Sequence, residues 1–162
     1  MSAKVPVVHS ISWFAVVIIV LIWASFIAGF AFLFSSNGIF IGMVVFSLLG
    51  IVLQLAIPLS HRKGMRAVKK RDFTAARKHF EDSASFFTRH KWIDIYRALT
   101  LFSISKMYYH EIALCNIAFC YTQTEEPQRA KALYEQILKQ YPENGIAYYG
   151  LKSIQAFSAK GD

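Results

Sequence analysis

Two long apolar stretches near the start of the chain constrain its fold more than any other feature. From residue 5 to residue 61 the sequence contains no aspartate, glutamate, lysine or arginine. Within this region, residues 11–34 and 39–58 are almost entirely apolar, and the break between them contains Asn37 and Gly38. An α-helix rises about 1.5 Å per residue, so either stretch can cross a hydrocarbon core of about 30 Å. The sequence therefore predicts two spanning helices joined by a tight turn.

A cleaved signal peptide is the alternative interpretation of the first stretch. Its apolar core would cover about 7 to 15 residues and would follow a basic start. Here the stretch is longer, and only Lys4 precedes it. We therefore expect residues 1–60 to form a membrane anchor and residues 61–162 to form a cytoplasmic domain.

Positive charge is concentrated directly after the second stretch. The net charge of the chain is +8, and residues 61–79 hold eight lysines and arginines against the single acid Asp72. The break between the apolar stretches is uncharged, so the positive-inside rule places both termini in the cytoplasm. A bacterial cytoplasmic membrane is the simplest host for this arrangement.

The same basic cluster is expected to contact anionic lipid headgroups, each base near the surface contributing up to about 1 kcal/mol. The candidate residues are Arg62, Lys63, Arg66, Lys69 and Lys70. No nucleic-acid recognition motif accompanies them, so nucleic acid is not an expected partner.

The sequence contains no pattern that indicates catalysis, metal binding or cofactor binding. It has no phosphate-binding glycine loop, no nucleophile elbow, and no histidines and cysteines at zinc-site spacing. Cys115 and Cys120 lie on one predicted helix and point in different directions, which disfavours a disulfide between them. We expect two reduced thiols, no metal, no cofactor and no enzyme activity.

Residues 111–144 have the spacing of two short amphipathic helices joined by a turn. Apolar residues recur every three or four positions on both sides of the polar segment "TQTEEPQ". Pro127 suits the first turn of the second helix, and Pro142 ends it. The repeated positions are Leu114, Asn116, Ile117, Ala118, Tyr121, Ala130, Tyr134 and Pro142. With these residues the segment resembles the tetratricopeptide repeat, a family of 34-residue helix-turn-helix units.

A weaker copy of the same pattern covers residues 57–90. It places Gly64, Ala76 and Phe80 at the small, small and aromatic positions, with residues 71–73 in the turn. The first helix of this copy coincides with the basic cluster. The chain is therefore predicted to be all-α, a transmembrane hairpin followed by a short array of helical hairpins.

Two segments fall outside the repeats. Residues 91–110 form an aromatic insert, for which we favour packing over the repeats or a backward extension of the following helix, because two hairpins make a thin array. The alternative is the lipid headgroup region, because the insert mixes aromatic side chains with lysine and arginine. Residues 145–158 predict a capping helix. Its mostly inward side chains are expected to be Ile146, Tyr149, Leu151, Ile154 and Phe157.

The resemblance implies a protein partner that binds the concave surface formed by the first helix of each repeat. Projected onto this chain, that surface contains Ile112, Cys115, Asn116, Phe119 and Gln123. Some members of the family clamp a C-terminal carboxylate with lysine, asparagine and arginine, and only Asn116 fits such a clamp. An apolar groove there would suit an amphipathic helix or an element of the same chain, such as residues 91–110. For each of these residues, however, we favour ordinary core packing.

Small residues on the predicted spans allow close helix packing. They are Ser25 and Gly29 on the first span, and Gly38, Gly42 and Gly50 at the start of and along the second. The pattern fits contact within the hairpin, a homo-oligomer or another membrane subunit. Two functions follow as hypotheses: a membrane-anchored adaptor that recruits a protein partner, or an accessory structural subunit of a larger membrane complex.

Overall fold

The computed structural model describes residues 11–34 and 37–158. Within these ranges the chain is mainly α-helical, and its only β-type pairing is an isolated bridge between Ile11 and Ser105. The predicted all-α fold is confirmed. The chain divides into two compact units. We call residues 11–58 and 91–106 the apolar unit, and residues 59–90 and 107–158 the stack unit.

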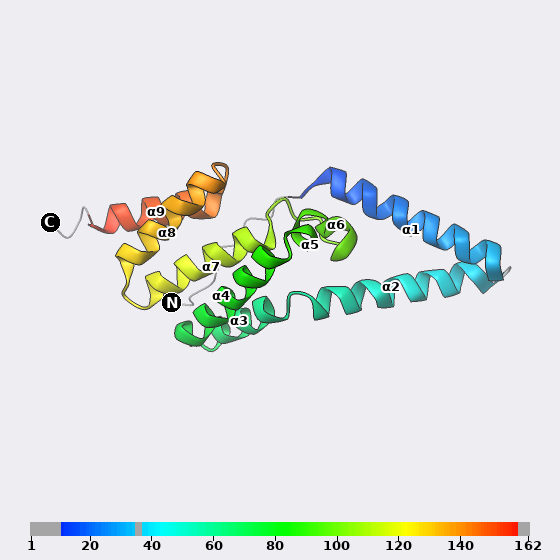
Figure 1. The fold of residues 1–162 in the computed structure, drawn as a ribbon, viewed down its shortest axis with the longest axis horizontal. Coiled ribbons are helices and arrows are strands. Elements are labelled where there is room, and N and C mark those ends of the chain that lie inside the picture. Colours follow the sequence, from blue (N-terminus) through cyan, green and yellow to red (C-terminus); the bar gives the residue numbers. More distant parts are fainter. Residues whose placement is uncertain (1–10, 35–36, 159–162) are drawn as a thin grey trace. The chain divides into compact units, whose positions relative to one another are not determined.

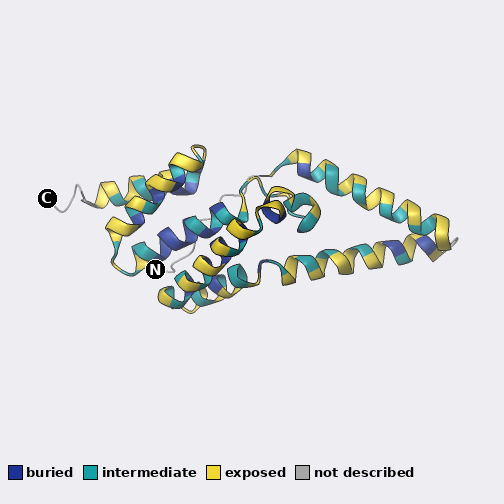
Figure 2. Ribbon diagram, in the orientation of Figure 1, coloured by how far each residue is buried: buried dark blue, intermediate teal, exposed yellow. Residues whose placement is uncertain are grey.

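Helices α1 (Trp13–Phe34) and α2 (Gly38–Ala56) form the hairpin of the apolar unit (Figure 1). Both helices are long and apolar enough to cross a membrane, and almost none of their residues is buried in the molecule (Figure 2). A core helix of a soluble protein would be mostly covered, so this exposure favours lipid as the surroundings of both helices. Two parts of these predictions lie outside the described residues: Lys4, considered for the signal peptide, and Ser35 and Ser36 of the predicted turn.

The first part of the aromatic insert belongs to the apolar unit. It contains two short helices, α5 (Lys91–Ile95) and α6 (Arg97–Thr100), followed by a non-helical segment. Figure 1 shows α6 between the diverging ends of α1 and α2. This differs from the expected packing over the repeats, because the exposed apolar side chains at the open end of the hairpin offer the insert a contact surface of its own.

Helices α3 (Leu59–Lys69) and α4 (Phe73–Arg89) form the first hairpin of the stack unit. Arg71 ends α3 in the left-handed conformation, with a φ of 61°, and the N–H of Asp72 donates to the carbonyl of Ala67 at 3.0 Å. This bond satisfies a carbonyl at the end of the helix. The Asp72 carboxylate then caps α4 by accepting a hydrogen bond from the N–H of Ala75 at 2.9 Å.

Helices α7 (Tyr109–Gln123) and α8 (Pro127–Gln140) form the second hairpin, and its turn has the same geometry. Glu125 is left-handed, with a φ of 59°, and the N–H of Glu126 donates to the carbonyl of Tyr121 at 3.0 Å. The corresponding bonds lie 54 residues apart in the sequence. The two hairpins therefore share a turn geometry as well as a sequence pattern.

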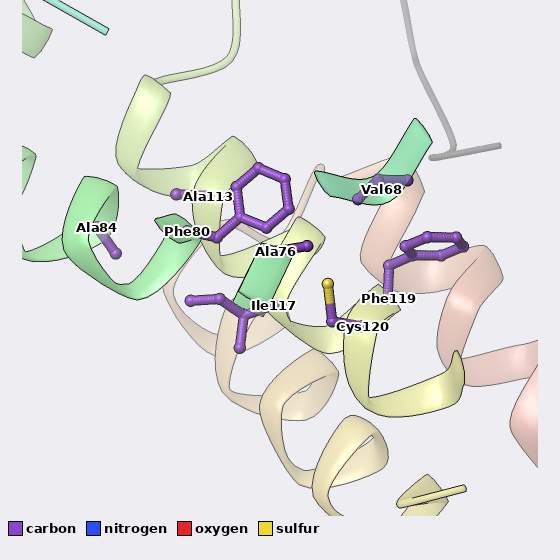
Figure 3. Packing of buried hydrophobic residues seen from close by; sticks show 8 residues of the cluster. All are labelled: Val68, Ala76, Phe80, Ala84, Ala113, Ile117, Phe119 and Cys120. Atoms are coloured by element: carbon purple, nitrogen blue, oxygen red, sulfur yellow. The ribbon is translucent and has the colours of Figure 1, made fainter. Parts of the chain in front are cut away.

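The helices of the stack unit pack in the order α3, α4, α7, α8 and α9 (Gly145–Ser158), with α7 at the centre. Two hydrophobic clusters hold them together. The first surrounds Phe80 and contains Val68, Ala76, Phe80, Ala84, Ala113, Ile117, Phe119 and Cys120 (Figure 3). The second surrounds Tyr134 and contains Cys115, Ala118, Ala130, Tyr134, Ile137, Ile146 and Ala147.

Candidate functional site

The five residues predicted to line a partner groove all lie on α7, and most of them are covered. Cys115, Asn116 and Phe119 are buried, Ile112 is half-buried and Gln123 is exposed. Figure 2 shows that burial extends along most of α7. The structure therefore places three of the five residues in the interior.

Neighbouring helices account for this burial. The amide nitrogen of Asn116 lies 4.0 Å from the sulfur of Met65 on α3. The ring of Phe119 meets the ring of Phe73 edge-on, with 6.1 Å between centroids. These contacts join α7 to the first hairpin, so Asn116 and Phe119 act in packing.

A buried polar network holds Cys115 in place and joins α7 to α9. Asn144 donates from Nδ2 to the Glu111 carboxylate at 2.8 Å and lies 3.3 Å from the Cys115 sulfur. Its Oδ1 accepts from the N–H of Ala147 at 2.7 Å, which caps α9. The second Glu111 oxygen accepts from the N–H of Tyr108 at 3.1 Å. The bonds of Asn144 to Glu111 and Cys115 join α9 to α7, and the other two bonds cap the first turns of these helices, so the network has a structural role.

The environment of the titratable core residues disfavours nucleophilic catalysis by these side chains. Burial raises the pKa of Cys115 and of Cys120 to about 12, so both thiols are protonated and weakly nucleophilic at neutral pH. Burial lowers the pKa of His61, which packs against the rings of Phe80 and Tyr109, to about 4. Among the residues that the structure describes, no group of histidine, cysteine and acidic side chains could hold a metal ion.

The basic residues predicted to contact lipid lie on α3 and at its end. Lys63, Arg66, Lys69 and Lys70 are exposed, and Arg62 is half-buried. The opposite side of α3 packs inward through Met65 and the buried Val68. The helix therefore separates its charged side from its packing side.

The small residues of the spans divide into two groups. A Cβ atom on Gly38 would overlap the backbone of Phe30, one on Gly42 would lie 3.0 Å from the Phe30 Cβ, and one on Gly50 would lie 3.4 Å from the Phe102 ring. These glycines serve contacts within the apolar unit. In contrast, Ser25 and Gly29 are exposed, and a Cβ on Gly29 would meet nothing within 4 Å.

The outer side of α9 is aromatic, which sequence reasoning missed. Ile146 is buried, and Leu151 and Ile154 pack inward, but the predicted inward positions of Tyr149 and Phe157 are wrong. These two side chains are 68% and 76% exposed. Because α9 packs mainly on α8, only one side of it is covered. Of the sequence signals, only the adjacent pair Tyr148 and Tyr149 could have indicated aromatics on two sides of the helix.

Comparison of the chain with models of protein families, with curated proteins and with solved structures finds no match.

Proposed function

We propose that this protein is a non-enzymatic, membrane-anchored adaptor. Helices α1 and α2 fix the chain in a membrane, and the stack unit binds a partner protein at the cytoplasmic face. Tethering raises the effective concentration of the stack unit near a membrane-bound partner. The observation that carries the proposal is the direct succession, in one chain, of two exposed apolar helices and a stack of packed helical hairpins.

The stack unit is proposed to be a tetratricopeptide-like module. Support comes from positions that correspond in the two hairpins: Gly64 and Ala118 are both buried, as are Phe80 and Tyr134. Each aromatic ring packs at a small residue, because a Cβ on Gly64 would lie 2.6 Å from the Phe80 ring and one on Gly150 would lie 2.6 Å from the Tyr134 ring.

The partner-binding surface is proposed to be the outer side of α9, since the groove residues of α7 are mostly covered. Tyr149 and Phe157 are exposed there, eight residues apart along one line of the helix, and the exposed Lys152 neighbours Tyr149. Helical arrays grow by stacking one helix on the last. The expected occupant is therefore an amphipathic helix of the partner protein.

An accessory structural subunit of a larger membrane complex is the second candidate. The exposed Ser25 and the open space at Gly29 favour it, because small residues on a span allow a second transmembrane helix to approach closely. In this function the spans, and not α9, carry recognition.

Affinity purification of the full chain in a mild detergent separates the two candidates. The adaptor is expected to retain a partner that the double substitution Tyr149→Ala, Phe157→Ala releases, whereas the exposed control Gln136→Ala keeps it. A partner that resists the double substitution and is released by Gly29→Leu would instead establish the subunit function.

A further inference from the structure

Residues 91–106 are attached to the open end of the α1–α2 hairpin by contacts with both helices. The N–H of Ser12 donates to the carbonyl of Ile104 at 2.8 Å, beside the bridge between Ile11 and Ser105. On the other side the Phe102 ring packs against Phe46, with 4.9 Å between centroids. The insert therefore contacts the hairpin on the side of each span.

The contacts of Phe102 lie well inside the span. Gly50 and Phe46 precede the last residue of α2, Ala56, by six and ten positions. At about 1.5 Å per residue, they lie about 9 Å and about 15 Å from the end of the helix. A side chain that reaches this depth is inside the hydrocarbon layer if α2 crosses a membrane.

Several backbone carbonyls of the insert have hydrogen-bond partners within the insert, as a hydrocarbon environment requires. The guanidinium of Arg97 donates to three carbonyls, those of Asp94, Ser105 and Lys106, at 3.1, 2.9 and 2.7 Å. The hydroxyl of Thr100 donates to the carbonyl of Ile93 at 2.7 Å. Non-helical backbone at membrane depth needs internal partners of this kind, and an arginine there is tolerated when it pairs with carbonyls.

The outer side of the insert is apolar and uncovered. Its exposed side chains are Trp92, Ile95, Tyr96, Leu99 and Ile104, between 43% and 58% exposed. Exposed lysines, Lys91 and Lys106, stand at its two ends. Like the spans, this side exposes apolar side chains, and terminal lysines beside aromatic residues match the headgroup layer of an anionic membrane.

We infer that residues 91–106 form a re-entrant membrane element, which enters the leaflet at the open end of the hairpin, closes the gap between the spans and is surrounded by lipid on its outer side. This inference rests on the membrane anchor of the proposed function.

Depth-dependent fluorescence quenching tests it in the full chain, reconstituted in vesicles of phosphatidylcholine and phosphatidylglycerol that carry nitroxide-labelled lipid. The variant Trp13→Phe, Trp23→Phe keeps Trp92 as its only tryptophan, and Trp13→Phe, Trp92→Phe keeps Trp23 in the span. A tryptophan-free chain with Tyr149→Trp is the control in water. Shallow nitroxides are expected to quench Trp92 at least about twofold more than the Tyr149→Trp control.

A tryptophan-free chain carrying Phe102→Trp is expected to respond most to deep nitroxides. Quenching of Trp23 alone, with Trp92 and the Phe102→Trp variant equal to the control, would overturn the re-entrant element and leave the anchor intact. If Trp23 also behaves like the control, the anchor fails, and the inference falls with it.

Discussion

The hairpins α3–α4 and α7–α8 are built alike, and their differences show what each position does. Their turns have the same left-handed residue and the same closing hydrogen bond. They differ at the end of the second helix. Asn144 caps the next helix of the stack, whereas the His90 ring, at the corresponding position, packs on Phe86 of the preceding helix, with its Nδ1 3.0 Å from the Phe86 carbonyl. After Asn144 the stack continues directly, and after His90 the chain leaves it for the apolar unit.

The hairpins also differ in the titratable group that each buries at one corresponding position, His61 in the first and Cys115 in the second. Burial lowers the pKa of the histidine to about 4 and raises that of the cysteine to about 12. Both shifts favour the neutral form, since desolvation penalises charge whatever its sign. At this position, therefore, acid lowers the stability of the first hairpin and alkali lowers that of the second.

The largest expected effect is that of Asn144→Ala. The substitution removes the cap of α9 and leaves the buried Glu111 carboxylate without its amide donor, so we expect a loss of about 3 kcal/mol. Native-state hydrogen exchange of the α7 and α9 amides in the detergent-solubilised chain measures it. His90→Ala is the matched control and should cost under about 1 kcal/mol. Equal losses would show that the two positions do not differ as described.

Gly64→Ala tests the close contact in the first hairpin. The added Cβ would lie 2.6 Å from the buried Phe80 ring, so we expect destabilisation by about 2 kcal/mol. Gly145→Ala, where a Cβ meets nothing within 4 Å, is the control and should be nearly neutral. The thermal unfolding midpoint, followed by circular dichroism, reports both. An unchanged midpoint in Gly64→Ala would mean that the ring does not determine the spacing of α3 and α4.

The stability of the stack should fall in acid because of His61. Its pKa in the fold is about 4, below the ordinary value of 6.5, so the unfolded chain binds the proton first. The contribution is present above about pH 6.5 and is lost as the pH falls toward 4. Because the imidazole is half-buried, solvent screening limits the loss to on the order of 1–2 kcal/mol. In His61→Phe the thermal unfolding midpoint should vary less with pH over this range. An unaltered pH dependence would show that other groups cause the loss of stability.

Ser83→Ala should stabilise the first hairpin. Within the described residues the buried hydroxyl of Ser83 has no hydrogen-bond partner, whereas the corresponding residue of the second hairpin is the apolar Ile137. Removing the hydroxyl should raise the free energy of unfolding by about 1 kcal/mol. The exposed Ser85→Ala is the control. A loss of stability in Ser83→Ala would show that the hydroxyl has a partner, such as a bound water.

Much of the fold could be predicted because its signals are local. The apolar stretches gave the spans to within about two residues, and Pro127 and the polar turn before it located the second hairpin. The candidate partner groove depends on signals that are not local. Ile112, Cys115, Asn116, Phe119 and Gln123 do share α7, but a single helix does not reveal how many neighbours will cover it.

The sequence by itself determined the longer helices and which of them favour lipid, because both properties follow from the spacing and polarity of neighbouring residues. Only the tertiary structure decided that residues 91–106 join the apolar unit, that α7 is covered, and that Tyr149 and Phe157 of α9 face outward. The physical reason is that burial depends on which elements pack together, and packing pairs residues that are far apart in the chain.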